Sequence, residues 1–497
     1  MKFINRGHEL GALQRLYRHH EAALMILYGR RRVGKTTLLS QWIQRRGIRR
    51  ALFWTATTQT SFVQLRDFSQ TLVRFETGSP IAEDFAFRDW EVAFAHLEEL
   101  ARASAEPLVA IIDEFTHLIQ SDPPLASLLQ RVWDHRLSRL PNLRLILTGS
   151  LIGLMERDVL SARAPLYGRA TALMKLRPLP FGCLKELFPR WSADERVAVY
   201  AICGGIPAYL ALFDGAKRFV DGLRDCLEPQ SIMVTDPALL LHDQLQGPQV
   251  YESILASITS GFHTWGDIAK MSGLGSGSNP SVYMRNLQSL GLIESRDPVL
   301  SPPAGRKGRY YIADPFLRFY YRFILPQRTY IQRGEKQAAL KPIIADLRGF
   351  IGEHVFEELC REWVYAEVEQ GTLGFVPEEI GSFWTQTRGQ RQAVQLDVVA
   401  ASRREKRLLV GECKWGAGSV ARSLLTDLVE RSKRMPEVTA PGWQVQYVLF
   451  AREGFTNATR QAAKEIGARL VGLAQLETRL VEFAARPHVA LPDDLKF

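Results

Sequence analysis

Residues 29–36 combine two glycines with a Lys-Thr pair in the spacing of a phosphate-binding loop. They read Gly29-Arg30-Arg31-Arg32-Val33-Gly34-Lys35-Thr36, which fits the pattern GxxxxGK[ST]. The backbone N–H groups of such a loop, together with the positive end of the following helix dipole, can surround a triphosphate. We expect ATP to bind along this loop and Thr37, with Lys35 on the β- and γ-phosphates and the Thr36 hydroxyl on Mg²⁺.

Two acidic residues, Asp113 and Glu114, directly follow the apolar run at 108–112. A carboxylate at the end of a buried strand costs free energy unless it serves a cation. We expect Asp113 to hold Mg²⁺ through water and Glu114 to activate the water that attacks ATP. The pair therefore predicts hydrolysis of the nucleotide as well as binding.

A further apolar run, at 143–147, ends in small hydroxyl residues on either side of a glycine. Thr148 or Ser150 is a candidate to hydrogen-bond the γ-phosphate or the attacking water. The alternative is a polar strand end that only opens a turn.

The C-terminal part of the chain carries a second group of residues suited to phosphodiester hydrolysis. Asp397 lies in one predicted strand, and Glu412 and Lys414 share a face of the next because strand side chains alternate. The two carboxylates would hold one or two divalent cations while Lys414 orients water or stabilises developing charge. Glu353 or Glu357, from a preceding predicted helix, is a candidate to complete the metal shell. The alternative is a solvated hairpin with three chance charges.

These residues need an α/β framework to position them. Apolar runs at 24–28 and 51–55 predict two more strands, and 37–43 has helical spacing after the loop. A chain of 497 residues is too long for one hydrophobic core. We expect a multidomain α/β protein with a P-loop ATPase core (1–175), a helical lid (176–235), a winged helix-turn-helix (236–325), a linker (326–342) and a C-terminal α/β domain (343–497).

The segment at 249–323 has the pattern of a winged helix-turn-helix. A predicted recognition helix at 280–290 is followed by two short strand-like runs around a basic, Pro/Gly-rich tip. Candidate DNA contacts are Arg285, Asn286 and Gln288 on the helix and Arg306, Lys307 and Arg309 in the wing. Winged helices also serve as lids or protein contacts, so this alternative stays open.

Composition narrows the class of protein. The formal net charge is +10, with basic residues partly in clusters, which favours a polyanionic partner such as DNA. Five cysteines without a CxxC pair indicate neither a disulfide framework nor a cysteine zinc site. The chain shows no apolar run long enough to span a bilayer and no secretory signal, so we expect a cytoplasmic protein without a membrane partner.

The sequence resembles archaeal-type ATPases of the AAA+ and signal-transducing (STAND) superclass with a nuclease-like C-terminal domain. The resemblance rests on these stretches together: Phe3-Ile4-Asn5-Arg6 with Glu9-Leu10, the loop at 29–36, Ile111-Ile112-Asp113-Glu114-Phe115, Leu147-Thr148-Gly149-Ser150, Pro165-Leu166-Tyr167-Gly168-Arg169 and Gly204-Gly205-Ile206-Pro207-Ala208-Tyr209-Leu210. It implies a lid in which Pro207 belongs to a GxP element that senses the nucleotide. It also implies that Arg169 is an arginine finger toward a neighbouring subunit or a switch arginine, where the residues alone allow a surface cation. Asp397, Glu412 and Lys414 are similar to the PD-(D/E)xK motif of restriction-endonuclease-like folds.

Three functions fit these patterns. The first is an oligomeric ATPase that couples ATP and Mg²⁺ binding to DNA binding and Mg²⁺-dependent DNA cleavage. The second is an ATP-dependent signalling switch or scaffold whose nuclease-like domain binds a partner or nucleic acid without cutting. The third is a DNA-binding ATPase similar to replication initiators and loaders.

Overall fold

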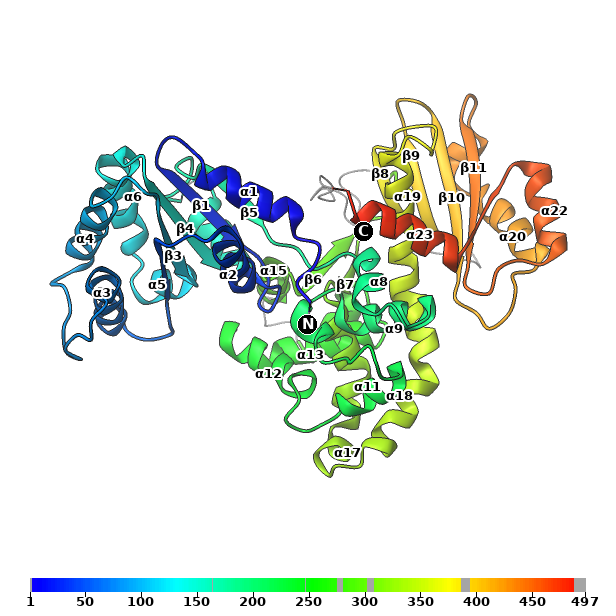
Figure 1. The fold of residues 1–497 in the computed structure, drawn as a ribbon. Coiled ribbons are helices and arrows are strands. Elements are labelled where there is room, and N and C mark those ends of the chain that lie inside the picture. The colour runs from blue at the N-terminus through cyan, green and yellow to red at the C-terminus, as the bar shows by residue number, and fades with distance from the viewer. Residues whose placement is uncertain are drawn as a thin grey trace. The chain divides into compact units, whose positions relative to one another are not determined.

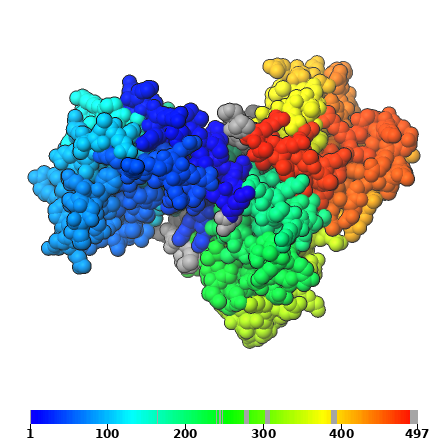
Figure 2. Space-filling view, viewed as in Figure 1, coloured from blue at the N-terminus to red at the C-terminus, as the bar shows by residue number. Residues whose placement is uncertain are grey.

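The computed structural model describes residues 2–162, 164–245, 247–274, 280–301, 308–385 and 394–486. It divides into two compact units. We call them the P-loop unit (Arg6–Pro178 with Ser289–Gly291) and the C-terminal unit (Met1–Asn5, Leu179–Gln288 and Leu292–Phe497). Most of the P-loop unit is blue to cyan in Figures 1 and 2, and most of the C-terminal unit is green to red.

The P-loop unit is built on a five-stranded parallel sheet in the order β2-β3-β4-β1-β5. The strands are β1 (Ala23–Tyr28), β2 (Ala51–Thr55), β3 (Leu108–Asp113), β4 (Leu143–Gly149) and β5 (Ala172–Lys175). The central strands are nearly continuous apolar runs because parallel sheets are covered on both faces. Since β4 lies between β3 and β1, the carboxyl ends of these three strands share one edge of the sheet.

Helices connect and cover this sheet (Figure 1). They are α1 (Gly7–Tyr17), α2 (Lys35–Arg46), α3 (Ser61–Thr77), α4 (Trp90–Arg102), α5 (Phe115–Ser121), α6 (Leu125–His135) and α7 (Ile152–Met155), with the short turns η1 (Leu137–Arg139) and η2 (Glu156–Leu160). The core beside the sheet is rich in aromatic rings. Trp54 and Trp90 both pack on Phe68, with ring centroids 4.9 Å and 5.6 Å apart. This buried cluster fixes α3 and α4 against β2.

The C-terminal unit begins with short helices and a winged helix-turn-helix. Its first helices are η3 (Phe181–Cys183), α8 (Leu184–Leu187), α9 (Ala193–Cys203), α10 (Pro207–Leu210), α11 (Phe219–Asp225) and α12 (Ile232–Gln244). The winged helix consists of α13 (Pro248–Thr259), α14 (Trp265–Met271), α15 (Pro280–Ser289), β6 (Ile293–Arg296) and β7 (Arg309–Ile312). β6 and β7 pair antiparallel, as the two arms of a wing do.

A second sheet, also of five strands, organises the rest of this unit in the order β12-β11-β10-β9-β8. Its strands are β8 (Glu379–Trp384), β9 (Gln395–Ser402), β10 (Arg407–Lys414), β11 (Gln444–Ala451) and β12 (Arg469–Gly472). β10, β11 and β12 are parallel, whereas β9 runs antiparallel to both β10 and β8. The α/β class expected from the sequence is confirmed.

The remaining helices include the segment that we expected to be a linker. They are α16 (Pro315–Phe319), η4 (Tyr320–Ile324), η5 (Leu325–Gln327), α17 (Arg328–Gln332), α18 (Lys336–Phe350), η6 (Ile351–Phe356), α19 (Glu357–Glu369), α20 (Arg422–Ser432), α21 (Pro436–Thr439), α22 (Asn457–Ile466) and α23 (Leu473–Ala484). The stretch 326–342 is therefore largely helical. It buries Ile331, Ala339 and Leu340, and this apolar packing outweighs its Pro and Gly residues.

The five cysteines are buried thiols. Burial raises the pKa of Cys226 to about 12 and raises that of Cys203 well above its usual range. Within the described ranges, no helix is both long and apolar enough to cross a membrane.

Candidate nucleotide site and C-terminal acidic pocket

The phosphate-binding loop joins β1 to α2, as its sequence pattern predicts. Gly29 starts the loop against the segment after β5, where a Cβ atom would lie 2.4 Å from the Leu176 carbonyl oxygen. Only glycine fits this approach. Lys35 opens α2, is 5% exposed, and its Nζ donates to the Gly29 carbonyl at 2.9 Å. Burial lowers the pKa of this ammonium, while Glu114 and Asp113 act to raise it. The hydrogen bond from Lys35 to Gly29 thus joins the two ends of the loop.

The predicted magnesium residues are already hydrogen-bonded to one another. The Thr36 hydroxyl donates to Asp113 Oδ2 at 3.0 Å, and the Thr148 hydroxyl donates to the other oxygen of the same carboxylate. Asp113 is 4% exposed. A hydroxyl and a carboxylate at this spacing are the oxygen ligands that Mg²⁺ prefers, so Thr36 and Asp113 fit the ion, with Asp113 supplying the negative charge.

Glu114 is held by the residue that follows β4. Its Oε2 accepts hydrogen bonds from the backbone N–H of Ser150 at 3.0 Å and from the Ser150 hydroxyl at 2.7 Å. Lys35 Nζ lies 3.8 Å from Oε1. The Glu114 backbone has φ 55°, a left-handed conformation that costs a non-glycine residue free energy and is common at functional sites. Thr148 and Ser150 therefore hold the two acids, a role that we did not assign to them from the sequence.

Arg6 contacts the loop, although we did not predict a role for it at the site. The guanidinium donates to the Val33 carbonyl at 3.3 Å and to the Arg177 carbonyl at 2.9 Å, and Glu9 pairs with it at 2.8 Å. The side chain is 7% exposed. The signal was present in the spacing Arg6-x-x-Glu9, which joins an arginine to its own counter-ion one helical turn away.

The family resemblance also implied roles for Arg169 and Pro207, which make none of the contacts described above for the phosphate-binding loop. Arg169 binds the carboxylate of Asp134 at 3.1 Å and the Tyr167 carbonyl at 3.0 Å, within the P-loop unit. Pro207 is the first residue of α10 in the C-terminal unit. Their roles as arginine finger and nucleotide sensor remain predictions.

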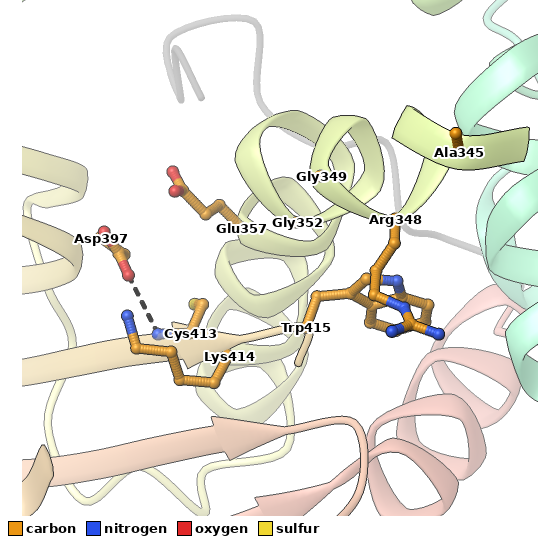
Figure 3. A pocket seen from close by; sticks show the side chains of 9 residues that line it. All are labelled: Ala345, Arg348, Gly349, Gly352, Glu357, Asp397, Cys413, Lys414 and Trp415. Atoms are coloured by element: carbon orange, nitrogen blue, oxygen red, sulfur yellow. Dashed lines mark hydrogen bonds between the residues drawn. The ribbon is translucent and has the colours of Figure 1, made fainter. Parts of the chain in front are cut away.

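Two of the predicted C-terminal acids, Asp397 and Glu357, line one pocket of about 520 Å³ together with Lys414, whereas Glu412 is not among its lining residues. Asp397 Oδ2 accepts the Cys413 N–H at 3.0 Å (Figure 3). The Glu357 side chain extends from α19 toward Asp397, and the Lys414 ammonium points to the same region. Burial and the nearby Glu412 raise the pKa of Asp397 to about 6, and burial and Asp397 raise that of Glu357 to about 8. A cation between these carboxylates would relieve this repulsion.

Glu412 is paired with two basic residues. Lys414 Nζ lies 2.9 Å from Oε1, and Arg431, from α20, lies 2.8 Å from Oε2. Arg431 also donates to the Gln395 carbonyl at 2.8 Å. We did not predict Arg431 at this site, because nothing in the sequence spacing links α20 to β10.

Glu357, and not Glu353, faces the pocket. The Glu353 side chain is 66% exposed and lies beside His354, so the structure favours the other candidate that the helix offered. In the part of the chain that the structure describes, no three His, Cys, Asp or Glu side chains converge as a ready metal cluster. The donor set suits a divalent cation, but Glu412 would first have to release a basic partner.

The predicted DNA contacts fall into three groups. Arg285 and Gln288 are exposed on α15, whereas Asn286 donates to the Tyr251 hydroxyl at 2.8 Å and faces inward. The Arg309 guanidinium lies over the Trp384 ring at 4.8 Å. Arg306 and Lys307 lie outside the described residues. Of these candidates, Arg285 and Gln288 are the ones whose side chains the structure leaves exposed.

Comparison with known proteins identifies the family. Residues 3–213 match a family described as an ATPase domain predominantly from Archaea. Residues 320–424 match one described as "Archaea bacterial proteins of unknown function". An uncharacterized protein of Methanocaldococcus jannaschii is 32% identical over 414 residues, covering 83% of this chain and 87% of that protein. The chain belongs to this archaeal-type ATPase family. The archaeal-type ATPase family expected from the sequence is confirmed.

Other similarities cover less of this archaeal-type ATPase or are weaker. An uncharacterized ATP-binding protein of the same organism is 49% identical over 49 residues, covering 10% of the chain and 83% of that protein. A Walker-type ATPase of Pyrococcus abyssi is 22% identical, with a TM-score of 0.48, covering 64% of this chain and 95% of that one. The Aeropyrum pernix ORC2 protein, solved as ADPNP-ADP complexes, is 16% identical, with a TM-score of 0.44, covering 67% and 96%.

Proposed function

We propose that this ATPase binds Mg²⁺-ATP on the loop at 29–36, hydrolyses it with Glu114 as general base, and uses nucleotide state to control DNA binding by the C-terminal unit. One observation carries the hydrolysis: the loop lysine, the Thr36–Asp113 pair and Glu114 converge at one sheet edge. In this proposal Lys35 binds phosphate oxygens, Thr36 and Asp113 hold Mg²⁺, and Glu114 accepts a proton from water. Mg²⁺ would supply the charge that neutralises the phosphates.

ATP turnover and ATP binding test this assignment. Glu114→Gln should lower kcat by about 100-fold or more while ATP still binds, because a general base typically contributes about 10²–10⁴-fold. Lys35→Ala should weaken ATP binding itself. Glu83→Gln, an exposed carboxylate in the same unit, is the matched control. Full turnover in Glu114→Gln would exclude Glu114 as the base.

For the C-terminal unit we propose Mg²⁺-dependent DNA cleavage at the acidic pocket. The observation in its favour is that Asp397, Glu357 and Lys414 line one pocket. Asp397 and Glu357 would hold the cation, with Glu412 joining when it releases Arg431, and Lys414 would orient the attacking water. Wild type should nick plasmid DNA in Mg²⁺ or Mn²⁺, whereas Asp397→Asn and Lys414→Ala should not. Absence of cleavage by wild type with either ion would reject this activity.

A switch or scaffold that does not cut is the second candidate, and Glu412 favours it. Its carboxylate already pairs with two basic side chains, Lys414 and Arg431, so the charge of Glu412 is balanced without a metal. In this case nucleotide-dependent binding of DNA or a partner would persist undiminished in Asp397→Asn. An initiator-like role would instead depend on the exposed face of α15, so Arg285→Ala with Gln288→Ala would abolish DNA binding.

We also propose assembly into homo-oligomers through the P-loop unit. The Arg169–Asp134 pair is partly exposed, with side-chain exposures of 33% and 35%. Arg169 could exchange this partner for the γ-phosphate of a neighbouring subunit. Mixed oligomers of Arg169→Ala and Lys35→Ala subunits test this role. Where an Arg169→Ala subunit supplies Lys35 and its Lys35→Ala neighbour supplies Arg169, the shared site is intact, so ATP turnover should recover.

A further inference from the structure

The wing of the winged helix is joined to the C-terminal sheet. Beyond β6, the Val299 N–H donates to the Ser382 carbonyl of β8 at 2.9 Å, and the Leu300 N–H donates to the Glu379 carboxylate at 2.8 Å. Val299 is 4% exposed and belongs to the core of the sheet domain. β8 is an edge strand, which presents unpaired backbone groups. The first arm of the wing covers part of that edge.

The second arm contacts the same strand. Arg309, in β7, places its guanidinium over the Trp384 ring of β8 at 4.8 Å. Such a contact is an electrostatic attraction between the cation and the ring face. Both arms of the wing are therefore fixed to β8.

Both wing strands are tied to α19 through Glu358. Arg296, the last residue of β6, lies 2.8 Å from Glu358 Oε1, and Arg318 Nη2 donates to the same oxygen at 3.1 Å. Arg318 also donates to the Ile312 carbonyl, at the end of β7, at 2.9 Å. One carboxylate thus gathers the ends of both wing strands.

Glu358 adjoins the residue that faces the acidic pocket. Successive helix residues point about 100° apart, so Glu357 lines the pocket while Glu358 meets the wing. One turn later, Arg361 lies 3.5 Å from Glu357 and donates to the Asp397 carbonyl at 2.9 Å. The rotation of α19 about its axis therefore sets both pocket carboxylates.

The segment before α19 does not have regular helical geometry. η6 (Ile351–Phe356) is a π-helix, a form that is mostly found as local bulges and often at functional sites. Its hydrogen bonds therefore skip one residue more than those of the α-helix that follows. The ion pairs on Glu358 lie at the first turn of α19, directly after this change.

We propose that Glu358 is a positioning residue through which the winged helix sets the acidic pocket. In this arrangement a shift of the wing moves Arg296 and Arg318, rotates the start of α19, and changes the placement of Glu357 and Asp397. A movement of the winged helix is thereby converted into a change in the spacing of the Glu357 and Asp397 carboxylates. The use of that pocket as a metal site rests on the proposed function, but the mechanical link does not.

Amide hydrogen exchange of the full chain tests the link. Glu358→Gln and Arg296→Gln should each speed exchange at least fivefold at amides 396–399 and 412–414. The double variant should match Glu358→Gln alone, because that substitution already removes the Arg296–Glu358 contact together with the Arg318–Glu358 contact. Glu477→Gln is the matched control, since it breaks a buried Arg–Glu pair between other elements of the unit, Arg196 with Glu477 at 2.6 Å.

The outcomes separate the link from the metal site. Acceleration confined to 294–300 and 356–360, or equal acceleration in the control, would overturn the positioning role. Mn²⁺ titration without nucleotide, followed by electron paramagnetic resonance, should show about fivefold weaker binding in Glu358→Gln. Unchanged Mn²⁺ affinity in Asp397→Asn would reject the metal site of the proposed function, while the exchange data would still decide the link.

Discussion

At the scale of single residues, the two candidate sites differ in how their acids are held. Asp113 and Glu114 accept hydrogen bonds from the hydroxyl groups of Thr36, Thr148 and Ser150, which can exchange partners at low cost, and the Lys35 ammonium lies farther off, 3.8 Å from Glu114. Glu412 is held by two full charges, Lys414 and Arg431. Displacing an ionic partner costs more free energy than displacing a hydroxyl group. The acids of the nucleotide site are therefore ready to bind ligands, whereas Glu412 must first give up an ion pair.

Arg6 should position the phosphate-binding loop. Arg6→Lys keeps the charge but cannot reach both the Val33 and Arg177 carbonyls, so the loop loses a charged hydrogen bond worth about 1.5–3 kcal/mol. We expect KM for ATP to rise about tenfold with kcat nearly unchanged, since the loop binds substrate and transition state alike. Steady-state kinetics measure this split.

The matched control is Arg50→Lys. Arg50 also donates to backbone carbonyls in the P-loop unit, including that of Glu106 at 2.8 Å. Equal rises in KM for both variants would point to general loss of stability and contradict the assignment to Arg6.

Glu362 predicts a pH-dependent stability. Burial and then Glu358 raise its pKa from 4.5 to about 7, and its Oε1 finds no hydrogen-bond partner among the described residues. A raised pKa means that the folded state binds the Glu362 proton more tightly than the unfolded state does. The contribution of this carboxyl to the free energy of unfolding is therefore complete below pH 4.5 and is lost as pH rises through 7. The loss amounts to about 3 kcal/mol.

Denaturant unfolding at pH 5 and pH 8 measures this contribution. Wild type should lose more stability than Glu362→Gln between the two values, because glutamine does not titrate. Other buried acids act equally in both proteins, so identical pH dependence would show that Glu362 titrates normally.

At the scale of elements, the sequence predicted the positions of the strands well and the side-chain contacts between distant elements poorly. Apolar runs predicted β1 to β4 within two residues, because strands of a parallel sheet buried on both faces need such runs. Asp397 and Glu412 were placed on neighbouring strands, as β9 and β10 show. The contacts of Arg431, Arg6 and Ser150 were missed, since they depend on packing between elements far apart in sequence.

Gly205 should be essential to the turn between α9 and α10. It has φ 74°, and a Cβ atom would lie 2.0 Å from the Leu179 carbonyl oxygen. Gly205→Ala should destabilise the protein by more than the roughly 1 kcal/mol expected from the backbone conformation alone. Gly334, with φ 75° and open space around its Cβ position, gives the control variant Gly334→Ala. Equal losses in thermal unfolding would mean that the close contact relaxes without cost.

At the scale of the whole molecule, the chain joins an ATPase sheet to a unit in which the wing belongs as much to the C-terminal sheet as to the helix-turn-helix. The sequence predicted a winged helix and a sheet domain separated by a linker. The structure instead packs them together through Val299, Arg309 and Glu358. Such packing cannot be predicted from the local sequence, because Val299 and Arg309 would be equally compatible with a wing that contacts no other domain.

The charge of the chain predicts salt-dependent DNA binding. With a formal net charge of +10, DNA affinity should fall steeply as NaCl rises from 50 to 200 mM, because phosphate contacts release counterions. Arg285→Ala should reduce the slope of log K against log salt by about one. Lys464→Ala, an exposed cation on α22, should leave the slope unchanged. A slope unaffected by Arg285→Ala would remove α15 from the DNA interface.

The burial of all five cysteines makes the chain well suited to site-specific spectroscopy. A maleimide dye reacts with exposed thiolates, and these five thiols are buried. A pair of cysteines introduced at Tyr330 and Phe62, which are 44% and 68% exposed, would carry one label in each unit without removal of native residues. Energy transfer between the labels could then follow, in single molecules, how ATP changes the separation of the two units.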